Sequence, residues 1–388
     1  MYQIKKLNKI SGAVYDELTK AKYNVSEDIE LADADAILVR SAKCHDMEIP
    51  EKLLAVARAG AGVNNIPIDK MTQKGVVVFN TPGANANAVK ELVICALLVA
   101  SRNVVEAAQW TNGLIGSEDM AKQVEKGKSA FKGPELKGKT FGVIGLGAIG
   151  VLVANAADAL GMKVIGYDPY LSVNSALHLS RNIEIASKID ELLTAADYIT
   201  VHVPLMDATK NYIDAPEFEK MKKGVIVLNF ARDGIVNEKA LLNALAEEKV
   251  AKYVTDFPDE TLLKTKNVIC TPHLGASTPE SEENCAVMAA MELRDYIEKG
   301  SIKNSVNMPA CELAAPAGYR LTLIHKNLPN MVGQMTAILA KEQINIEEMA
   351  NKSRGDIAYT VFDLNREASE EAVKELSKIE GMIKIREI

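Results

Sequence analysis

Residues 140–150 read TFGVIGLGAIG, an apolar run followed at once by three glycines with the spacing G-x-G-x-x-G. The run Thr140–Ile144 predicts a buried β-strand that leads through the glycines into a helix. Gly145 would permit a tight turn. Gly147 lacks a Cβ, so another molecule could approach its backbone closely, and Gly150 would let the helix pack against the strand.

A glycine turn that opens a helix is suited to the pyrophosphate of a dinucleotide. The helix, expected at Val151–Leu160, would present unpaired N–H groups and the positive end of its dipole. Asp168 follows the next expected strand, Lys163–Tyr167, eighteen residues after Gly150. Its carboxylate would accept hydrogen bonds from ribose hydroxyls and repel a 2′-phosphate, so the pattern favours NAD over NADP. The glycines alone are a weak signal, but strand, turn, helix, strand and acid occur here in register.

Short aliphatic runs on both sides of this stretch indicate two series of buried parallel strands. In the first series we expect strands at Ala36–Val39, Leu53–Ala57 and Val76–Phe79, and a helix at Ala88–Ser101. In the second series, further strands are expected at Tyr198–His202, Val225–Phe230, Tyr253–Asp256 and Val268–Thr271. A long polar helix, about Pro279–Lys299, follows them.

The pattern changes after residue 300. Residues 301–318 hold Pro309, Pro316 and several alanines, and they are typical of a linker. Strands and helices then alternate in the order β-α-β-β-α-β, at Arg320–Ile324, Gly333–Gln343, Ile346–Ser353, Ala358–Leu364, Glu370–Ile379 and Ile383–Ile388. This order predicts a ferredoxin-like unit.

Composition limits the class of protein. With 388 residues, 48% hydrophobic and 25% charged, the chain should form two or three globular domains. The net charge of −7 argues against nucleic acid or an anionic membrane as the main partner. The five scattered cysteines suggest free thiols in a reducing compartment. The chain starts without an apolar signal segment, and the apolar stretch near Leu92–Ala100 is too short to span a bilayer, so we expect a cytoplasmic protein.

Three predicted strand ends carry side chains suited to hydride transfer from an alcohol. Arg232 follows one strand, Asp256 and Glu260 another, and His273 a third. Because carboxyl ends of parallel strands meet at one edge of a sheet, these groups should lie at the same edge. The reaction needs a base for the hydroxyl proton, a cation for the substrate carboxylate and a nicotinamide. It needs no metal, and no metal-ligand spacing is present.

The segments GLGAIG, VHVPL, NFARDGIVNE and TPHLGAST, in this order, resemble the D-isomer-specific 2-hydroxyacid dehydrogenase family over roughly residues 36–305. The resemblance implies that Arg232 grips the substrate carboxylate and that His273 is the general acid/base. A carboxylate should pair with the imidazole; it is identified as Glu260, but the loop is shorter than usual in the family, and Asp259 is the alternative. Asp256 resembles the residue that hydrogen-bonds the nicotinamide amide.

The resemblance also implies a set of cofactor contacts. His202 and Pro204 match a segment that runs along the cofactor, although His202 is equally compatible with a packed structural histidine. The full NAD set is Gly145, Gly147, Ala148, Ile149, Gly150, Asp168, His202, Pro204, Phe230, Ala231, Arg232, Asp256, His273, Gly275 and Ala276.

The N-terminal segments 40–41, 58–66 and 80–83 resemble the substrate domain of those family members that oxidise 3-phosphoglycerate. There the backbone at Gly60 and Gly62 would meet the carboxylate, and arginines would meet the phosphate; surface ion pairs are the alternative for the arginines. The implied substrate set is Arg40, Ser41, Arg58, Gly60, Ala61, Gly62, Arg232 and His273.

Residues 319–388 resemble an ACT domain, a small amino-acid-sensing module. His325, Asn327 and Asn345 align with positions that bind L-serine in bacterial family members carrying this domain, although the asparagines could merely cap turns. The combination implies NAD-dependent oxidation of 3-phospho-D-glycerate to 3-phosphooxypyruvate, the first step of serine biosynthesis, with feedback inhibition by L-serine. Because such domains pair edge to edge, a homo-oligomer, dimer or tetramer, is implied.

The predicted fold class is therefore α/β, with a Rossmann-type domain inserted in a flavodoxin-like substrate domain and a C-terminal ferredoxin-like domain. The expected bounds are 1–94 and 278–305 for the substrate domain, 95–277 for the NAD domain, 306–318 for a linker and 319–388 for the ACT domain. Two other functions remain open. One is a related reductase for glyoxylate, hydroxypyruvate or 2-oxoglutarate. The other is a non-catalytic NAD-sensing protein, against which the presence of both His273 and Arg232 argues.

Overall fold

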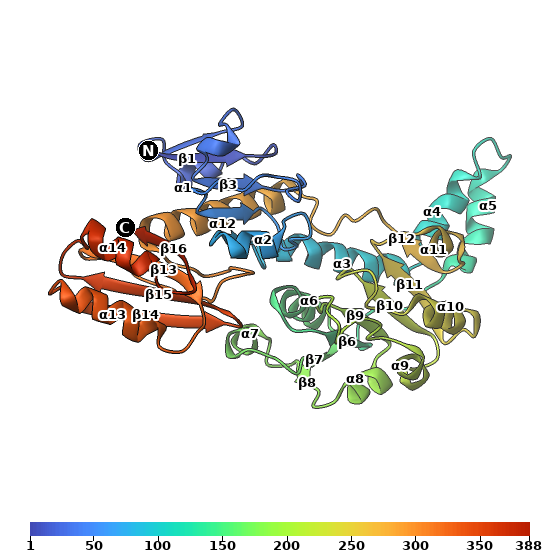
Figure 1. Cartoon of the computed structure of the whole chain (residues 1–388). Coiled ribbons are helices and arrows are strands. Elements are labelled where there is room, and N and C mark those ends of the chain that lie inside the picture. Colours follow the sequence, from blue (N-terminus) through green and yellow to red (C-terminus); the bar gives the residue numbers. More distant parts are fainter. The chain divides into compact units, whose positions relative to one another are not determined.

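The computed structural model describes all residues from 1 to 388, and these form two compact units (Figure 1). The first unit contains Met1–Asn85 and Pro279–Ile388, and the second contains Ala86–Thr278. The second unit is therefore inserted into the first along the chain, as the sequence predicted. The predicted boundary at residues 94/95, however, falls inside a helix, Ala86–Ser101.

The second unit is built on a parallel sheet. Its strands are β6 (Thr140–Ile144), β7 (Lys163–Tyr167), β8 (Glu184–Ile185), β9 (Tyr198–Val201), β10 (Val225–Asn229), β11 (Val250–Thr255) and β12 (Val268–Cys270). They are ordered β12-β11-β10-β9-β6-β7-β8. The chain winds outward from β6 to one edge and then returns through β9 to the other. This doubly wound order confirms the Rossmann-type prediction, and the winding direction reverses between β6 and β9, the point at which folds of this type bind their ligands.

Helices cover both faces of this sheet. The helical segments of the unit are α3 (Ala86–Ser101), α4 (Val104–Asn112), α5 (Met120–Gly127), η2 (Lys128–Phe131), α6 (Ala148–Ala159), α7 (Val173–His178), α8 (Ile189–Ala195), α9 (Ala215–Lys220), α10 (Glu238–Ala246) and α11 (Glu260–Lys264). Alternate strand residues enter two separate apolar clusters: Val143 and Leu228 pack with α3 and α6, whereas Val201 and Val227 pack with α8, α9 and α10. Figure 1 shows α4 and α5 extending away from the sheet.

The N-terminal part of the first unit is a second parallel sheet. Its strands are β1 (Tyr2–Lys6), β2 (Tyr23–Ser26), β3 (Ala36–Val39), β4 (Ala55–Arg58) and β5 (Val77–Phe79). The order β2-β1-β3-β4-β5 is the flavodoxin-like order that was predicted. Its helical segments are α1 (Val14–Glu17), η1 (Leu31–Asp33), α2 (Ile68–Gln73) and α12 (Pro279–Lys299). α12 has the length that a bilayer requires but is strongly charged, and no helix of the structure is suited to crossing a membrane.

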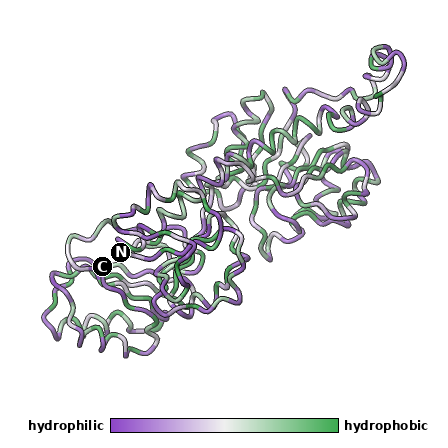
Figure 2. Tube along the Cα trace, turned by 90° about the horizontal axis from the view of Figure 1, so that it is seen from above, coloured by the Kyte–Doolittle hydropathy of each residue, from purple (hydrophilic) through white to green (hydrophobic).

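The C-terminal part of the first unit has the predicted β-α-β-β-α-β order. It comprises β13 (Tyr319–Lys326), α13 (Met331–Lys341), β14 (Ile346–Arg354), β15 (Ile357–Leu364), α14 (Glu370–Ser377) and β16 (Met382–Glu387). The antiparallel sheet has the order β14-β15-β13-β16. Its two helices cover one face, and the other face contributes Ile324, Tyr359 and Val361 to the apolar cluster of α12. Figure 2 shows hydrophobic and hydrophilic residues alternating along the chain trace.

The predicted linker is not a free connection between domains. It has neither helix nor long strand, but Met308 and Cys311 are buried in the core of the first unit. The side chain of Asn307 accepts a hydrogen bond from the backbone N–H of Val78 at 2.8 Å. Proline and alanine gave this segment the composition of a linker, although its scattered apolar residues pack like those of a core.

Candidate functional site

The glycine turn between β6 and α6 has the close packing that its sequence demands. Gly145 has a φ of +91°, and its N–H donates to the carbonyl of Tyr167 at 2.8 Å. A Cβ at Gly150 would lie 1.9 Å from the carbonyl oxygen of Gly145, so the helix can approach the strand only because Gly150 has no side chain. At Gly147 a Cβ would meet nothing within 4 Å. The turn therefore leaves open space in front of the first residues of α6.

Asp168 fixes the far side of the same turn. One carboxylate oxygen, Oδ2, accepts the N–H of Leu146 at 2.9 Å, and Oδ1 accepts the N–H of Tyr170 at 2.8 Å. Each oxygen keeps a further lone pair, which could accept a hydrogen bond from a ribose hydroxyl. The residues present therefore fit a dinucleotide: an open backbone turn at a helix start, with a fixed carboxylate beside it.

Arg232 lies in an exposed loop that a buried asparagine holds in place. The side chain of Asn229, at the end of β10, accepts the N–H of Ala231 at 3.1 Å and donates to the carbonyl of Arg232 at 3.0 Å. The guanidinium Nη1 donates to the carbonyl of Ala231 at 2.6 Å. Sequence reasoning missed Asn229. Its signal was an amide at the end of an otherwise apolar strand, where a buried polar group needs partners.

His273 sits in the loop after β12 with strained backbone geometry. Its φ is +45°, which is uncommon for a residue with a side chain. Its N–H lies 2.9 Å from the carbonyl of Asp256 and 3.1 Å from that of Thr271. The imidazole is exposed, and the ring of Phe257 meets it edge-on, with 5.1 Å between centroids. Because β10, β11 and β12 are neighbours in the sheet, Arg232, Asp256 and His273 follow three adjacent strand ends.

Asp256 is the buried member of this group, with 1% of its surface exposed. Burial raises the pKa of its carboxyl. The hydrogen bond from the N–H of Gly275, at 3.1 Å, and the charges of His273 and Arg232 act in the opposite direction but do not cancel this effect. Its Oδ1 atom is buried and has no hydrogen-bond partner. Asp256 is therefore a buried carboxyl at the same edge of the sheet as both candidate catalytic residues.

Neither carboxylate predicted to pair with His273 contacts it. Glu260 is the first residue of α11; its side chain is 83% exposed and forms an ion pair with Lys264 one turn later. Asp259 is the N-cap of the same helix, where Oδ1 accepts the N–H of Leu262 at 2.8 Å. Both groups are engaged in local helix contacts, which the sequence pattern did not reveal.

His202 packs under the glycine turn. Its Nε2 lies 3.0 Å from the hydroxyl of Thr200, and its Nδ1 is buried without a partner. Burial lowers the pKa of His202 to about 3, so the ring is neutral at physiological pH. A Cβ at Gly145 would lie 2.8 Å from the His202 carbonyl oxygen. His202 therefore packs against the glycine turn at Gly145.

Of the neighbouring cofactor candidates, Pro204 is exposed, whereas Phe230 and Ala231 are buried.

In the first unit, the predicted substrate residues gather at the carboxyl ends of β3 and β4. Asn8, which the sequence analysis missed, accepts the backbone N–H groups of residues 40, 41 and 42 through Oδ1. Arg40 forms an ion pair with Glu282 at 2.6 Å, and Nε of Arg58 donates to the Arg40 carbonyl at 3.0 Å. Gly60 has a φ of +150°, and its N–H donates to the hydroxyl of Thr81 at 2.8 Å.

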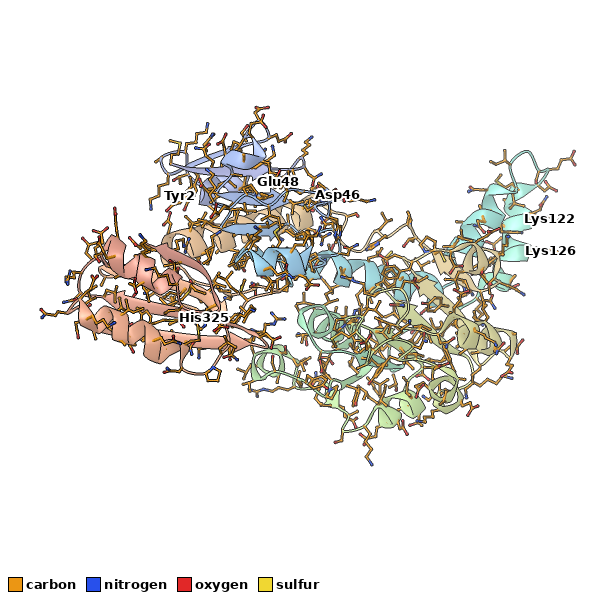
Figure 3. All side chains as sticks on the ribbon, in the orientation of Figure 1. Tyr2, Asp46, Glu48, Lys122, Lys126 and His325 are labelled. Atoms are coloured by element: carbon orange, nitrogen blue, oxygen red, sulfur yellow. The ribbon has the colours of Figure 1, made fainter.

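The three predicted effector residues do not lie together: His325 and Asn327 are at the end of the C-terminal sheet where β15 begins, whereas Asn345 is at the opposite end, where β15 ends. His325, labelled in Figure 3, is buried on β13; Nδ1 lies 2.7 Å from the Lys326 carbonyl and Nε2 2.8 Å from the Thr360 hydroxyl. Burial lowers the pKa of His325. Asn327 and Asn345 are exposed; the amide of Asn327 donates to the Gly355 carbonyl at 3.2 Å.

Comparison with known proteins identifies the family. Residues 94–275 match the model described as D-isomer specific 2-hydroxyacid dehydrogenase, NAD binding domain. The D-3-phosphoglycerate dehydrogenase of Escherichia coli (strain K12) is 32% identical over 349 residues, which cover 87% of this chain and 82% of that protein. This chain belongs to the D-isomer-specific 2-hydroxyacid dehydrogenase family. The match confirms the family resemblance and the prediction of NAD as cofactor.

Other members of the 2-hydroxyacid dehydrogenase family extend the comparison. The D-3-phosphoglycerate dehydrogenase of Methanocaldococcus jannaschii is 39% identical over 72% of this chain, but the match covers 53% of that protein. The chain thus spans about half the length of that relative. Among solved structures, an NAD⁺-bound 3-phosphoglycerate dehydrogenase of Entamoeba histolytica has a TM-score of 0.63 and 29% identity, covering 79% of this chain and 98% of that one.

Proposed function

We propose that this protein oxidises 3-phospho-D-glycerate to 3-phosphooxypyruvate with NAD as the hydride acceptor. The observation that carries the proposal is that Arg232, Asp256 and His273 follow three adjacent strand ends, in a chain whose relatives are named for this activity. The glycine turn and Asp168 would hold the dinucleotide.

In this proposal His273 accepts the hydroxyl proton of the substrate while the hydrogen on the same carbon leaves as hydride, and a carbonyl forms. The bound nicotinamide supplies the hydride acceptor. Arg232 carries an exposed guanidinium that can bind the substrate carboxylate through two N–H groups and orient the reacting carbon. The backbone bonds of Asn229 hold this loop, so the guanidinium starts from a fixed base.

The phosphate would be held by residues of the first unit. Arg58 and the N–H groups near Gly60 are the candidates, because charge-assisted donors favour a phosphate. Arg40 is already paired with Glu282, so a phosphate would have to compete with that carboxylate. We expect both Arg58→Gln and Arg40→Gln to raise KM for phosphorylated substrates.

One assay tests the proposed reaction. NADH formation is followed at 340 nm with 3-phosphoglycerate, and the reverse reaction with 3-phosphooxypyruvate, 2-oxoglutarate, hydroxypyruvate and glyoxylate. We expect the highest kcat/KM with the phosphorylated pair. A higher value for any other acid would replace the proposed substrate, and turnover retained within a few fold by His273→Ala would refute the catalytic role of His273.

We further propose that L-serine binds the C-terminal part of the first unit and inhibits the enzyme. The support is the ferredoxin-like fold and the exposed amides of Asn327 and Asn345, each of which offers a donor and an acceptor to an amino acid. Because the two residues lie at opposite ends of the sheet, a ligand that contacts both would have to bridge two chains. Calorimetry with L-serine should show binding that Asn345→Ala weakens. Unchanged oxidation at millimolar L-serine would refute the regulatory claim.

A homo-oligomer, dimer or tetramer, is also part of the proposal. A hollow of about 700 Å³ lies between α3 and α4, lined by Leu98, Val99, Val104, Ala107 and Ala108 among others. Leu98 and Val104 are 42% and 47% exposed, which is a large apolar exposure for two neighbouring helices. Light scattering should show an assembly that Leu98→Glu weakens.

The proposed cytoplasmic location, which the free cysteines support, can be checked by cell fractionation.

A further inference from the structure

The carboxyl ends of β1 and β3 meet at the point where the N-terminal sheet changes its winding direction. β1 lies between β2 and β3, so the chain adds β2 on one side and then β3, β4 and β5 on the other. Parallel sheets of this order bind their ligands beside these two strand ends. Asn8 follows β1 by two residues, and residues 40–42 follow β3 directly. Both segments therefore lie where this class of fold is expected to bind a ligand.

One side-chain oxygen collects the N–H groups of the loop after β3. Oδ1 of Asn8 accepts the N–H groups of residues 40, 41 and 42 at 3.2, 3.0 and 2.9 Å. None of the three donates to a backbone carbonyl. Asn8 is more than thirty residues away in the chain, so this contact is not a local turn. The conformation of the loop therefore depends on a single amide oxygen from β1's side of the sheet.

The carbonyl groups of the same loop are also held by side chains. Nε of Arg58, at the end of β4, donates to the carbonyl of Arg40 at 3.0 Å. Nδ2 of Asn65 donates to the carbonyl of Ala42 at 2.8 Å and lies 3.4 Å from that of Arg40. Asn8 thus fixes the N–H groups of the loop, and the other two side chains fix its carbonyls. The backbone from which the loop's side chains extend is held on both sides.

The side chains that leave this backbone are suited to a phosphate. Arg40 and Arg58 follow β3 and β4, which pair as neighbours, and Ser41 adds an exposed hydroxyl. A phosphate favours several charge-assisted donors held in a fixed arrangement. Because a displaced loop would move Arg40 and Ser41 together, the affinity for a phosphate depends on the contacts that hold the loop.

We infer that Asn8 is a positioning residue for the phosphate of the substrate, and that it sets the preference for phosphorylated over unphosphorylated 2-oxo acids. This inference rests on the proposed function, in which the loop after β3 meets the phosphate. Asn8 bonds the loop and none of the candidate catalytic residues, so it acts through Arg40 and Ser41. Without its oxygen, three N–H groups lose their partner and the loop loses the contact that fixes it.

The test compares 3-phosphooxypyruvate with hydroxypyruvate, which differs only in lacking the phosphate, as substrates of Asn8→Ala. NADH consumption at 340 nm gives kcat and KM for each acid. We expect KM for 3-phosphooxypyruvate to rise at least about tenfold while kcat stays within about twofold, because the loop carries no catalytic residue. KM for hydroxypyruvate should change by less than about twofold. Asn8→Gln, whose amide is displaced by one methylene, is the second variant and should show the same selective loss.

Amide hydrogen exchange of residues 40–42, measured without substrate or NAD, follows the loop itself. Asn8→Ala should remove the protection of these amides, whereas Asn8→Asp keeps an acceptor oxygen and should keep the protection. The matched control is Asn24→Ala on β2, the strand on the other side of β1. The side chain of Asn24 donates to that of Gln3 at 2.7 Å, so the control also removes an amide contact of β1. It should leave both the exchange and the kinetic preference unchanged.

Protection that survives in Asn8→Ala would overturn the inference, because Asn8 would then not hold the loop. An equal fall in kcat/KM for both acids would also overturn it, because the effect would not depend on the phosphate. If the wild-type enzyme reduces neither acid, the proposed function fails, whereas the exchange measurement still decides whether Asn8 holds the loop.

Discussion

The buried ion pair between Arg320 and Asp363 gives the sharpest prediction of stability. Nε and Nη2 of Arg320 lie 2.5 and 2.6 Å from the two oxygens of Asp363, and the arginine side chain is 3% exposed. Its Nη1 also donates to the carbonyls of Lys299 and Ala314, at 2.7 Å each. In Asp363→Asn the guanidinium would remain buried without a counter-charge, and such a loss typically costs about 3–5 kcal/mol.

Because the asparagine retains one acceptor oxygen, we expect the lower end of that range, about 3 kcal/mol. For a unit of this size, a loss of 1 kcal/mol lowers the midpoint temperature of thermal unfolding by about 2–4 °C. The midpoint of the first unit should therefore fall by about 10 °C. The assay is circular dichroism at 222 nm with a parallel urea titration. The control is Glu375→Gln, which removes an exposed partner of Lys378 in the same C-terminal part and should leave the midpoint unchanged. An Asp363→Asn midpoint within 2 °C of wild type would refute the reasoning.

Other predictions concern a lysine and two glycines. Burial lowers the pKa of Lys384 from 10.5 to about 8, so the unfolded chain binds more protons between about pH 8 and 10.5, and the stability linked to this group rises with pH there. Urea midpoints should show the stability of Lys384→Met relative to wild type falling by about 1–2 kcal/mol from pH 7.5 to 9.5; an unchanged difference contradicts this sign. Gly147→Ala should keep the unfolding midpoint but weaken NAD binding at least about tenfold in a fluorescence titration, because the added methyl enters open space in front of the turn. Gly145→Ala should lower the free energy of unfolding by about 1–3 kcal/mol, because its φ of +91° is strained for alanine. Equal stability of the Gly145→Ala and Gly147→Ala variants would be inconsistent with this turn geometry.

Much of the fold could be predicted where a local signal and a burial pattern coincide. The strands Thr140–Ile144 and Lys163–Tyr167 and the helix Pro279–Lys299 have the bounds expected from the sequence. The strand Tyr2–Lys6 was not predicted, because only Ile4 of its residues is fully buried and the lysines hide the alternation. Its place in the sheet comes from pairing with residues 23–26 and 36–38, which no local pattern encodes.

For the same reason, only part of the candidate site could be predicted from the sequence. The strand ends that carry Arg232 and His273 followed from the rule that parallel strands present their carboxyl ends together. The local contacts of Glu260 and Asp259 could not be predicted, because they depend on loop conformation and on competition from nearby groups. Lys264 lies four residues after Glu260, a spacing that favours an ion pair within the helix. A motif alignment records the carboxylate but not the lysine that engages it.

The contacts between the C-terminal sheet and α12 are another feature that the sequence analysis did not predict. One face of this sheet packs against its own helices, and the other face bears arginine, threonine and tyrosine side chains as well as apolar ones. In the structure these polar groups reach the last carbonyls of α12: Arg386 donates to Tyr296 at 2.5 Å, and the Tyr359 hydroxyl donates to Gly300 at 2.7 Å. The guanidinium of Arg386 also lies 4.3 Å from the centre of the Tyr296 ring. Cations and donors are favourable at a helix C-terminus, because the carbonyls there have no partners within the helix. A ligand that altered the C-terminal sheet would therefore act on α12, a helix that begins six residues after His273 in the chain.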